Sequence, residues 1–287
     1  MNRIIFLISL FLLLPQISFS KSTQLQTGSE LIASLDDRYR DNRSNCGDEN
    51  SPAFLCSGIL LRGTVPSDNY HSWNPSPHSQ ESGGVSFSYL RHDSKLITLD
   101  AGYQNGFIFS PYASDSEGKI HPEVLCYFPA NADSVNRDNH GCGIYMGMSQ
   151  GESCQQQGIT TVQQWIQNYN DSGQDDSAQC GFDVKLQTSG NADAFMQGVQ
   201  ARLQLQLTEN NEAILATWPQ DIPNQLPIEA FFYLSRNDGG LQGAQHDQKD
   251  FYNSTGKVIP IVKIELPPDY NQSASFTYYT SDQVINN

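Results

Sequence analysis

The stretch Leu60-Leu61-Arg62-Gly63-Thr64 follows Ile59 and joins an apolar run to a single arginine. Three consecutive apolar residues predict a buried β-strand, with Arg62 at its exposed end. The stretch Gly83-Gly84-Val85-Ser86-Phe87-Ser88-Tyr89-Leu90-Arg91 predicts a second strand. Because a strand alternates its side chains with period two, Ser86 and Ser88 share one face, and Phe87 and Tyr89 share the other.

These two strands, with the aromatic and proline-rich loop 70–77 between them, have the residue types of a nucleotide site. A guanidinium such as that of Arg62 binds a pyrophosphate through a bidentate fork, which lysine does not copy. The hydroxyls of Ser86 and Ser88 can fix an arginine and a ribose without filling a pocket. Trp73, in the loop, is a candidate for stacking on a planar ring, although it is equally suited to anchor the loop on the core.

The length and charge of the chain favour an exported protein. Residues 1–20 have a basic start, an apolar centre and a small-x-small end, which is the pattern of a secretory signal. Residues 21–287 then fit a single catalytic domain, and we expect no membrane span in it. The formal net charge of the whole chain is −15, so we expect no nucleic-acid partner, because phosphate backbones need a basic face.

All six cysteines follow the signal, and an even number in an exported chain indicates disulfide bonds. Spacing alone favours the short-range pairs 46–56, 126–142 and 154–180. Residues 131–180 carry three of the six cysteines and begin with a stretch rich in Gly, Ser, Asn and Gln, which predicts an irregular, cross-linked insertion. We find neither CxxC nor HExxH, so we expect no metal site.

The hydrophobic pattern predicts an α+β domain with mixed or antiparallel sheets and a few helices. Helices are expected over residues 29–39, 160–169 and 191–203. Besides the two strands above, the predicted strands are 95–99, 106–109, 123–128, 213–218, 228–234, 258–266 and 275–280. Residues 237–254 are expected to form a loop that leads into the strand 258–266.

Two short motifs offer a carboxylate that could stabilise a cationic transition state. Gln150-Gly151-Glu152 lies in the cysteine-containing insertion, and Gln245-His246-Asp247 lies in the predicted loop. Each of them, taken alone, is more typical of a solvated loop. Gly147-Met148-Ser149-Gln150-Gly151 matches the G-x-S-x-G pattern of serine hydrolases, but the chain lacks the repeated βα units that this pattern requires.

Taken together, four stretches of the chain resemble the halovibrins, a family of secreted bacterial proteins. They are Leu60-Leu61-Arg62-Gly63-Thr64, the loop 72–77, the stretch 83–91, and Gln245-x-Asp247-Gln248-x-Asp250-Phe251. Halovibrins are described as NAD⁺ glycohydrolases, so the resemblance implies cleavage of the nicotinamide–ribose bond, with NAD⁺ as substrate and no cofactor.

A looser resemblance to ADP-ribosyltransferases of the cholera-toxin type implies a similar core. Those proteins have an arginine on a first strand, a serine-x-serine strand, and a loop with a glutamate before a later strand. Arg62 matches the first feature, and Ser86 with Ser88 matches the second. This sequence departs from the third, because no Glu-x-Glu occurs and Gln245-x-Asp247 stands where the acid is expected.

The resemblance implies a role for each candidate residue. Arg62 would bind the pyrophosphate or the adjacent ribose, and Ser86 and Ser88 would brace Arg62 and the nicotinamide ribose. Asp247, with Glu152 as the alternative, would face the developing cation, and Gln245 would orient the attacking water. The rings expected to pack on nicotinamide are Trp73, Phe87 and Tyr89.

Two other functions stay open at this stage. A mono-ADP-ribosyltransferase would use the same residues to modify a host protein, and it would transfer label from NAD⁺ to that acceptor. A secreted binding protein without enzymatic activity would use the Trp73 loop and the cross-linked surface for recognition, and it would tolerate Arg62→Lys.

Overall fold

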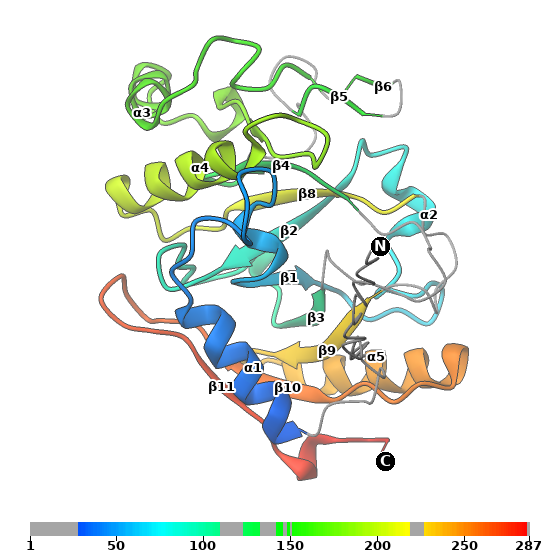
Figure 1. The fold of residues 1–287 in the computed structure, drawn as a ribbon. Coiled ribbons are helices and arrows are strands. Elements are labelled where there is room, and N and C mark those ends of the chain that lie inside the picture. Colours follow the sequence, from blue (N-terminus) through cyan, green and yellow to red (C-terminus); the bar gives the residue numbers. More distant parts are fainter. Residues whose placement is uncertain are drawn as a thin grey trace, which may run out of the picture.

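The structure is a computed structural model, and it describes residues 28–109, 123–132, 142–145, 148–149, 151–218 and 227–285. It has the predicted α+β class, with one large mixed sheet and a few helices around it (Figure 1). The expected signal at residues 1–20 lies outside the described residues. None of the described helices is long and apolar enough to cross a bilayer.

Among the described residues, nine strands form the large sheet, in the order β11-β10-β9-β3-β1-β2-β8-β4-β7. All neighbouring strands are antiparallel except β9 and β10, which run parallel. A two-stranded ribbon, β5 with β6, lies outside this sheet. The strands are β1 (Ile59–Gly63), β2 (Val85–Leu90), β3 (Asn105–Phe109), β4 (Glu123–Phe128), β5 (Ile144–Tyr145), β6 (Met148–Ser149), β7 (Phe182–Asp183), β8 (Glu212–Ala216), β9 (Ile228–Tyr233), β10 (Ile261–Glu265) and β11 (Ser275–Thr277).

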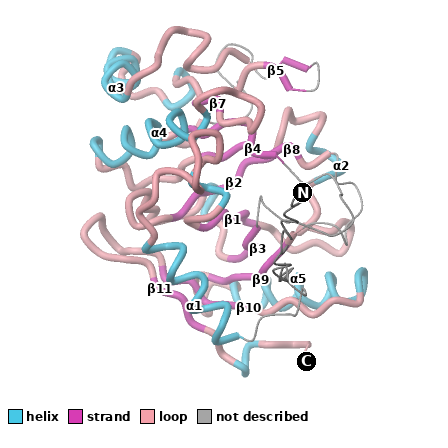
Figure 2. Tube along the Cα trace, in the orientation of Figure 1, coloured by secondary structure: helices cyan, strands magenta, loops and turns pink. Residues whose placement is uncertain are grey.

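The helices cover both faces of the sheet (Figures 1 and 2). They are α1 (Gly28–Arg40), α2 (Ser76–Ser79), α3 (Val162–Asp171), α4 (Asn191–Leu205) and α5 (Gly240–Thr255). Apolar residues of α3, α4 and α5 share one core cluster with Leu60 of β1 and Phe87 of β2. On the opposite face, α1 places Leu31 and Leu35 in a second cluster with Leu61. Burial on both faces explains why most residues of the central strands are apolar.

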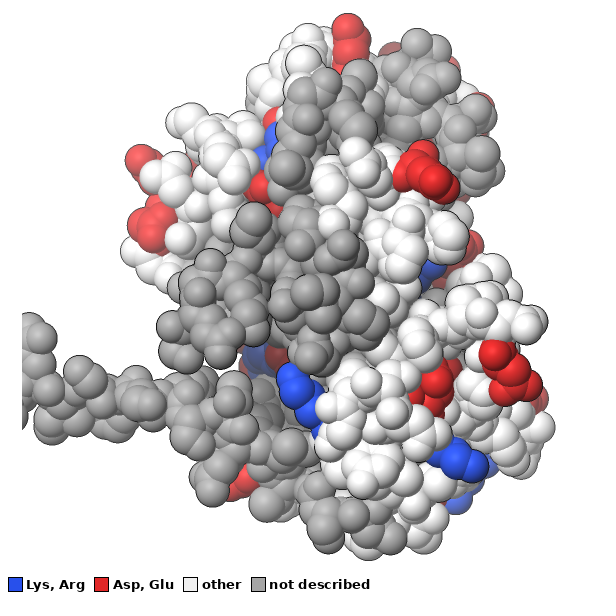
Figure 3. Space-filling model, turned by 90° about the vertical axis from the view of Figure 1, so that its right-hand side faces the viewer, with Lys and Arg blue, Asp and Glu red and all other residues white. Residues whose placement is uncertain are grey.

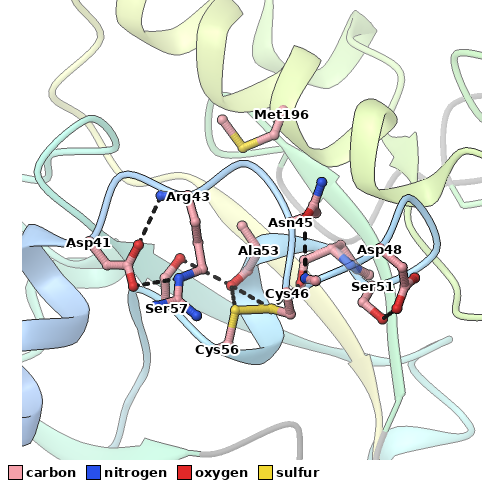
Figure 4. The surroundings of a disulfide bond; sticks show 12 residues. Asp41, Arg43, Asn45, Cys46, Asp48, Ser51, Ala53, Cys56, Ser57 and Met196 are labelled. Atoms are coloured by element: carbon pink, nitrogen blue, oxygen red, sulfur yellow. Dashed lines mark hydrogen bonds and ion pairs between the residues drawn. A yellow bond between two sulfur atoms is a disulfide. The ribbon is translucent and has the colours of Figure 1, made fainter.

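The three disulfides pair Cys46 with Cys56, Cys126 with Cys142, and Cys154 with Cys180, which confirms the pairing favoured by spacing. The first of them closes the loop between α1 and β1 (Figure 4). In that loop Asp41 pairs with the guanidinium of Arg43 at 2.6 Å, and the hydroxyl of Ser57 donates to the carbonyl of Ala53. Closed loops of this kind restrict the unfolded chain and so stabilise the folded one.

Two predicted elements are wrong. Residues 95–99 form no strand, and most of the loop expected at 237–254 is the helix α5. The glycines of α5 explain the error, because glycine disfavours helix in isolation but permits close packing here. A Cβ on Gly243 would lie 2.4 Å from the amide oxygen of Asn105, so this face of α5 approaches β3 only without a side chain.

Candidate functional site

The site begins at the end of β1, where Arg62 reaches the neighbouring strand β2. Its Nη1 donates a hydrogen bond of 2.6 Å to the carbonyl oxygen of Ser86. Within the described residues, no carboxylate lies within ion-pair distance of this guanidinium. Burial lowers the pKa of Arg62, while the negative potential of Tyr103, Glu212 and Asp100 acts in the opposite direction. A half-buried cation without a paired anion favours an anionic ligand.

The register of β2 against β8 brings a glutamate beside the serine pair. Ser86 lies opposite Ile214 and Phe87 opposite Ala213, so the next step of this antiparallel register puts Ser88 opposite Glu212. Directly opposed residues share a face of the sheet, so Ser86, Ser88 and Glu212 lie on one face. Sequence reasoning missed Glu212, although it stands at the start of the strand predicted at 213–218.

Glu212 is a buried carboxylate, with 2 % of its surface exposed. Its Oε2 accepts a hydrogen bond of 2.8 Å from the backbone N–H of Ala132, in the segment that follows β4. Asn210, two residues before it, accepts a hydrogen bond from the hydroxyl of Ser88 through Oδ1, and the Nδ2 of Asn210 is buried without a partner among the described residues. Asn210-x-Glu212 before a strand is the sequence signal that would have found this carboxylate.

The apolar core on this face is interrupted where these groups lie. Leu61 and Leu90 belong to the cluster under α1, whereas Ile214 and Phe128 belong to a separate cluster on β8 and β4. β2 lies between β1 and β8; it adds Leu90 to the first cluster but presents Ser86 and Ser88 on the same face, between the two clusters. Since burying polar groups costs free energy, a polar gap in a core indicates a site rather than a packing element.

An open cleft of about 510 Å³ lies beside the end of β1. It is lined by the residues after β1, those before β3 and the first turns of α5. Tyr103 lines the cleft, and its ring also packs on Gly63, the residue after Arg62. A Cβ on Gly63 would lie 2.4 Å from that ring. The size is that of an ordinary small-molecule site.

Asp247, one of the two candidate acids, is fully buried in α5 behind this cleft. Its Oδ2 accepts from the hydroxyl of Thr64 at 2.8 Å, and its Oδ1 accepts from the hydroxyl of Ser72 at 2.6 Å. Burial raises its pKa, although these hydroxyls and His246 act to lower it. These two hydroxyl contacts fix the loop after β1 to α5, and a further one with the amide of Asn105 at 3.4 Å ties α5 to β3, which is a structural arrangement.

The other two polar candidates lie apart from Arg62. Gln245 donates to the carbonyl oxygen of Asp282, so its amide holds the C-terminal segment. Glu152 is exposed in the cysteine-containing insertion, beyond the β7 edge of the sheet. Figure 1 shows the ribbon β5–β6 of that insertion and α5 at opposite ends of the fold.

The aromatic candidates are buried in the core, whereas the resemblance implies that they pack on nicotinamide. Trp73 is fully buried, donates from Nε1 to Asp250 at 2.8 Å and packs edge-on against Phe251. Phe87 and Tyr89 are also buried, on the face of β2 opposite the serines. Alternation in a two-sided sheet buries both faces, so the aromatic face packs under the helices.

Positive charges are scattered over the face drawn in Figure 3. Figure 3 shows Lys and Arg as separate spots, with no continuous basic patch over the described part of that face. Within the described ranges, no three His, Cys, Asp or Glu residues gather as metal ligands do. No known protein-family model matches the chain, and no curated protein matches it at a significant level.

Proposed function

We propose that the protein is a secreted NAD⁺ glycohydrolase of the halovibrin family, built on an ADP-ribosyltransferase-like core. The observation that carries this proposal is the group formed by Arg62, Ser86 and Glu212 around the strand β2. From β1, the half-buried guanidinium of Arg62 donates to the backbone carbonyl of Ser86, although its Cα lies opposite Phe107 on the other face of the sheet. From β8, the buried Glu212 lies on the face of the serine side chains. This group unites the three features of the resemblance, with Glu212 in the place first given to Asp247 or Glu152. Three disulfides are compatible with an oxidising, extracytoplasmic compartment.

The chemistry of NAD⁺ hydrolysis fits these residue types. The bond between C1′ of the ribose and the nicotinamide nitrogen breaks, and its electron pair leaves with nicotinamide as a neutral base. The sugar then resembles an oxocarbenium ion, which a nearby carboxylate and hydrogen bonds to the 2-hydroxyl stabilise. Water attacks C1′ and releases one proton, so the products are nicotinamide, ADP-ribose and H⁺.

Each residue of the group has a role in this scheme. Arg62 binds the pyrophosphate, because its charge has no carboxylate partner within the described residues. The hydroxyl of Ser86 contacts the nicotinamide ribose. Glu212, desolvated and on the serine face, stands opposite the developing positive charge. Trp73, Asp247 and Gln245 support this geometry through the loop after β1 and through α5.

The test is nicotinamide release from NAD⁺ by the purified, oxidised protein, without any protein acceptor. We expect equal amounts of nicotinamide and ADP-ribose, and a loss of at least 100-fold in kcat/KM for Arg62→Lys. Arg236→Lys is the matched control, because the guanidinium of Arg236 pairs with the carboxylate of Asp282, at 2.8 Å, and not with β1 or β2. This variant should retain activity.

Two other results would favour a different function. Label transferred from NAD⁺ to a protein, with little free ADP-ribose, would support a mono-ADP-ribosyltransferase. No release by correctly folded protein would refute the enzyme and favour a binding protein.

A further inference from the structure

We infer that Asn211 is a positioning residue for this site, which sets Glu212 in its place opposite Ser88; the inference rests on the proposed function. Asn211 is fully buried and stands directly before Glu212. Its side chain bonds the backbone of Tyr89 on β2, the strand that carries the serines.

The amide of Asn211 imitates a peptide unit. Its Oδ1 accepts from the backbone N–H of Tyr89 at 2.7 Å, and its Nδ2 donates to the backbone carbonyl of Tyr89 at 2.8 Å. These are the two backbone groups that an opposing strand residue would bind in an antiparallel ladder. The side chain therefore continues the ladder of β2 beyond Glu212, the first residue of β8.

Two further contacts tie the same amide to other parts of the core. Its Nδ2 lies 2.9 Å from the hydroxyl of Ser94 and 3.1 Å from the hydroxyl of Tyr127 on β4. Since β4 lies on the other side of β8, the amide connects both strands that flank Glu212. A carboxylate held between two fixed strands cannot move away from the serine face without breaking these bonds.

Asn211→Ala tests this role through a split between kcat and KM. We expect kcat for NAD⁺ hydrolysis to fall at least 10-fold while KM changes less than threefold, because Arg62 still binds the pyrophosphate. Asn191→Ala is the matched control, since it also removes a fully buried amide, whose Nδ2 donates to the carbonyl of Lys185 in another part of the fold. It should lower the melting temperature without changing kcat.

A double substitution separates positioning from general damage. If Asn211 acts through Glu212, then Asn211→Ala should cost less than threefold in kcat when Glu212→Gln is already present. Should Asn211→Ala fail to fold, Asn211→Asp is measured in its place, because it keeps the acceptor for the N–H of Tyr89 and loses both donors. The same split and the same non-additivity are expected for it.

The outcomes are distinct. An active wild type with unchanged kcat in the folded Asn211 variant would overturn the inference and leave the proposed function intact. Full multiplicative losses in the double variant would overturn it as well. An inactive wild type would overturn both.

Discussion

Replacing Glu212 with glutamine removes one negative charge from the site and changes little else. The backbone N–H of Ala132 donates to Oε2 of Glu212 at 2.8 Å, and it can still donate to the Oε1 of a glutamine. The volume is conserved, so the packing of β8 against β2 and β4 should stay as it is. The variant therefore measures the charge alone.

The magnitude follows from the burial of the carboxylate. Two unit charges 4 Å apart attract by about 4 kcal/mol at an effective dielectric constant of 20. Because the sugar carries only part of a full charge in the transition state, we expect a loss of about 3 kcal/mol. This corresponds to a decrease of about 100-fold in kcat, the range found when one electrostatic contact is removed from an active site.

The assay is the initial rate of nicotinamide release at saturating NAD⁺, and the control is Glu123→Gln. Glu123 also has a buried carboxylate that accepts from a backbone N–H, that of Leu186 at 3.0 Å, and it lies at the far end of β4. We expect less than a threefold change for Glu123→Gln. Equal rates for Glu212→Gln and the wild type would refute the assignment of the carboxylate.

Three other substitutions test the structural roles around the cleft. Asp247→Asn should lower the free energy of unfolding by about 1–3 kcal/mol, because the hydroxyls of Thr64 and Ser72 lose a charged acceptor, and should leave kcat within threefold of wild type. A 100-fold loss of nicotinamide release would return the catalytic role to Asp247. Trp73→Ala should cost about 3–5 kcal/mol in urea unfolding, and a cost below 1 kcal/mol would contradict the anchoring of the loop. His246→Gln should destabilise the protein more at pH 5.5 than at pH 8.5. Burial lowers the pKa of His246, but the carboxylates of Asp68 and Asp247 raise it by more, so the folded pKa lies above 6.5. The contact of the charged imidazole with these carboxylates therefore stabilises the protein below pH 6.5 and is lost as the pH rises through the folded pKa. The difference should stay below about 1 kcal/mol, and equal unfolding curves for the two proteins at pH 5.5 would count against it.

The sequence was most informative where short-range patterns determine structure. The alternation in residues 85–90 and the helical spacing in residues 29–39 correspond to β2 and α1. The short-range disulfide pairs favoured by spacing are also the ones found, although six cysteines allow fifteen pairings. These features depend on neighbours in the chain, so a single sequence contains them.

The site required long-range information that the sequence alone did not provide. Glu212 meets Ser88 only because β8, which starts at residue 212, pairs with β2, and nothing in the local pattern fixes that pairing. Asp247 was expected in a loop because the glycines of α5 have a low helix propensity, although in the fold they let this helix pack closely on β3. Trp73 was equally suited to a ligand or to the core, and its contact with Asp250 places it in the core.

The most direct test of the account is a crystal structure of Glu212→Gln with NAD⁺, since slow hydrolysis would preserve the substrate. We predict the pyrophosphate on Arg62 and the nicotinamide ribose between Ser86 and residue 212. A nucleotide bound elsewhere, or a protein that binds none at saturating concentration, would contradict the proposed site.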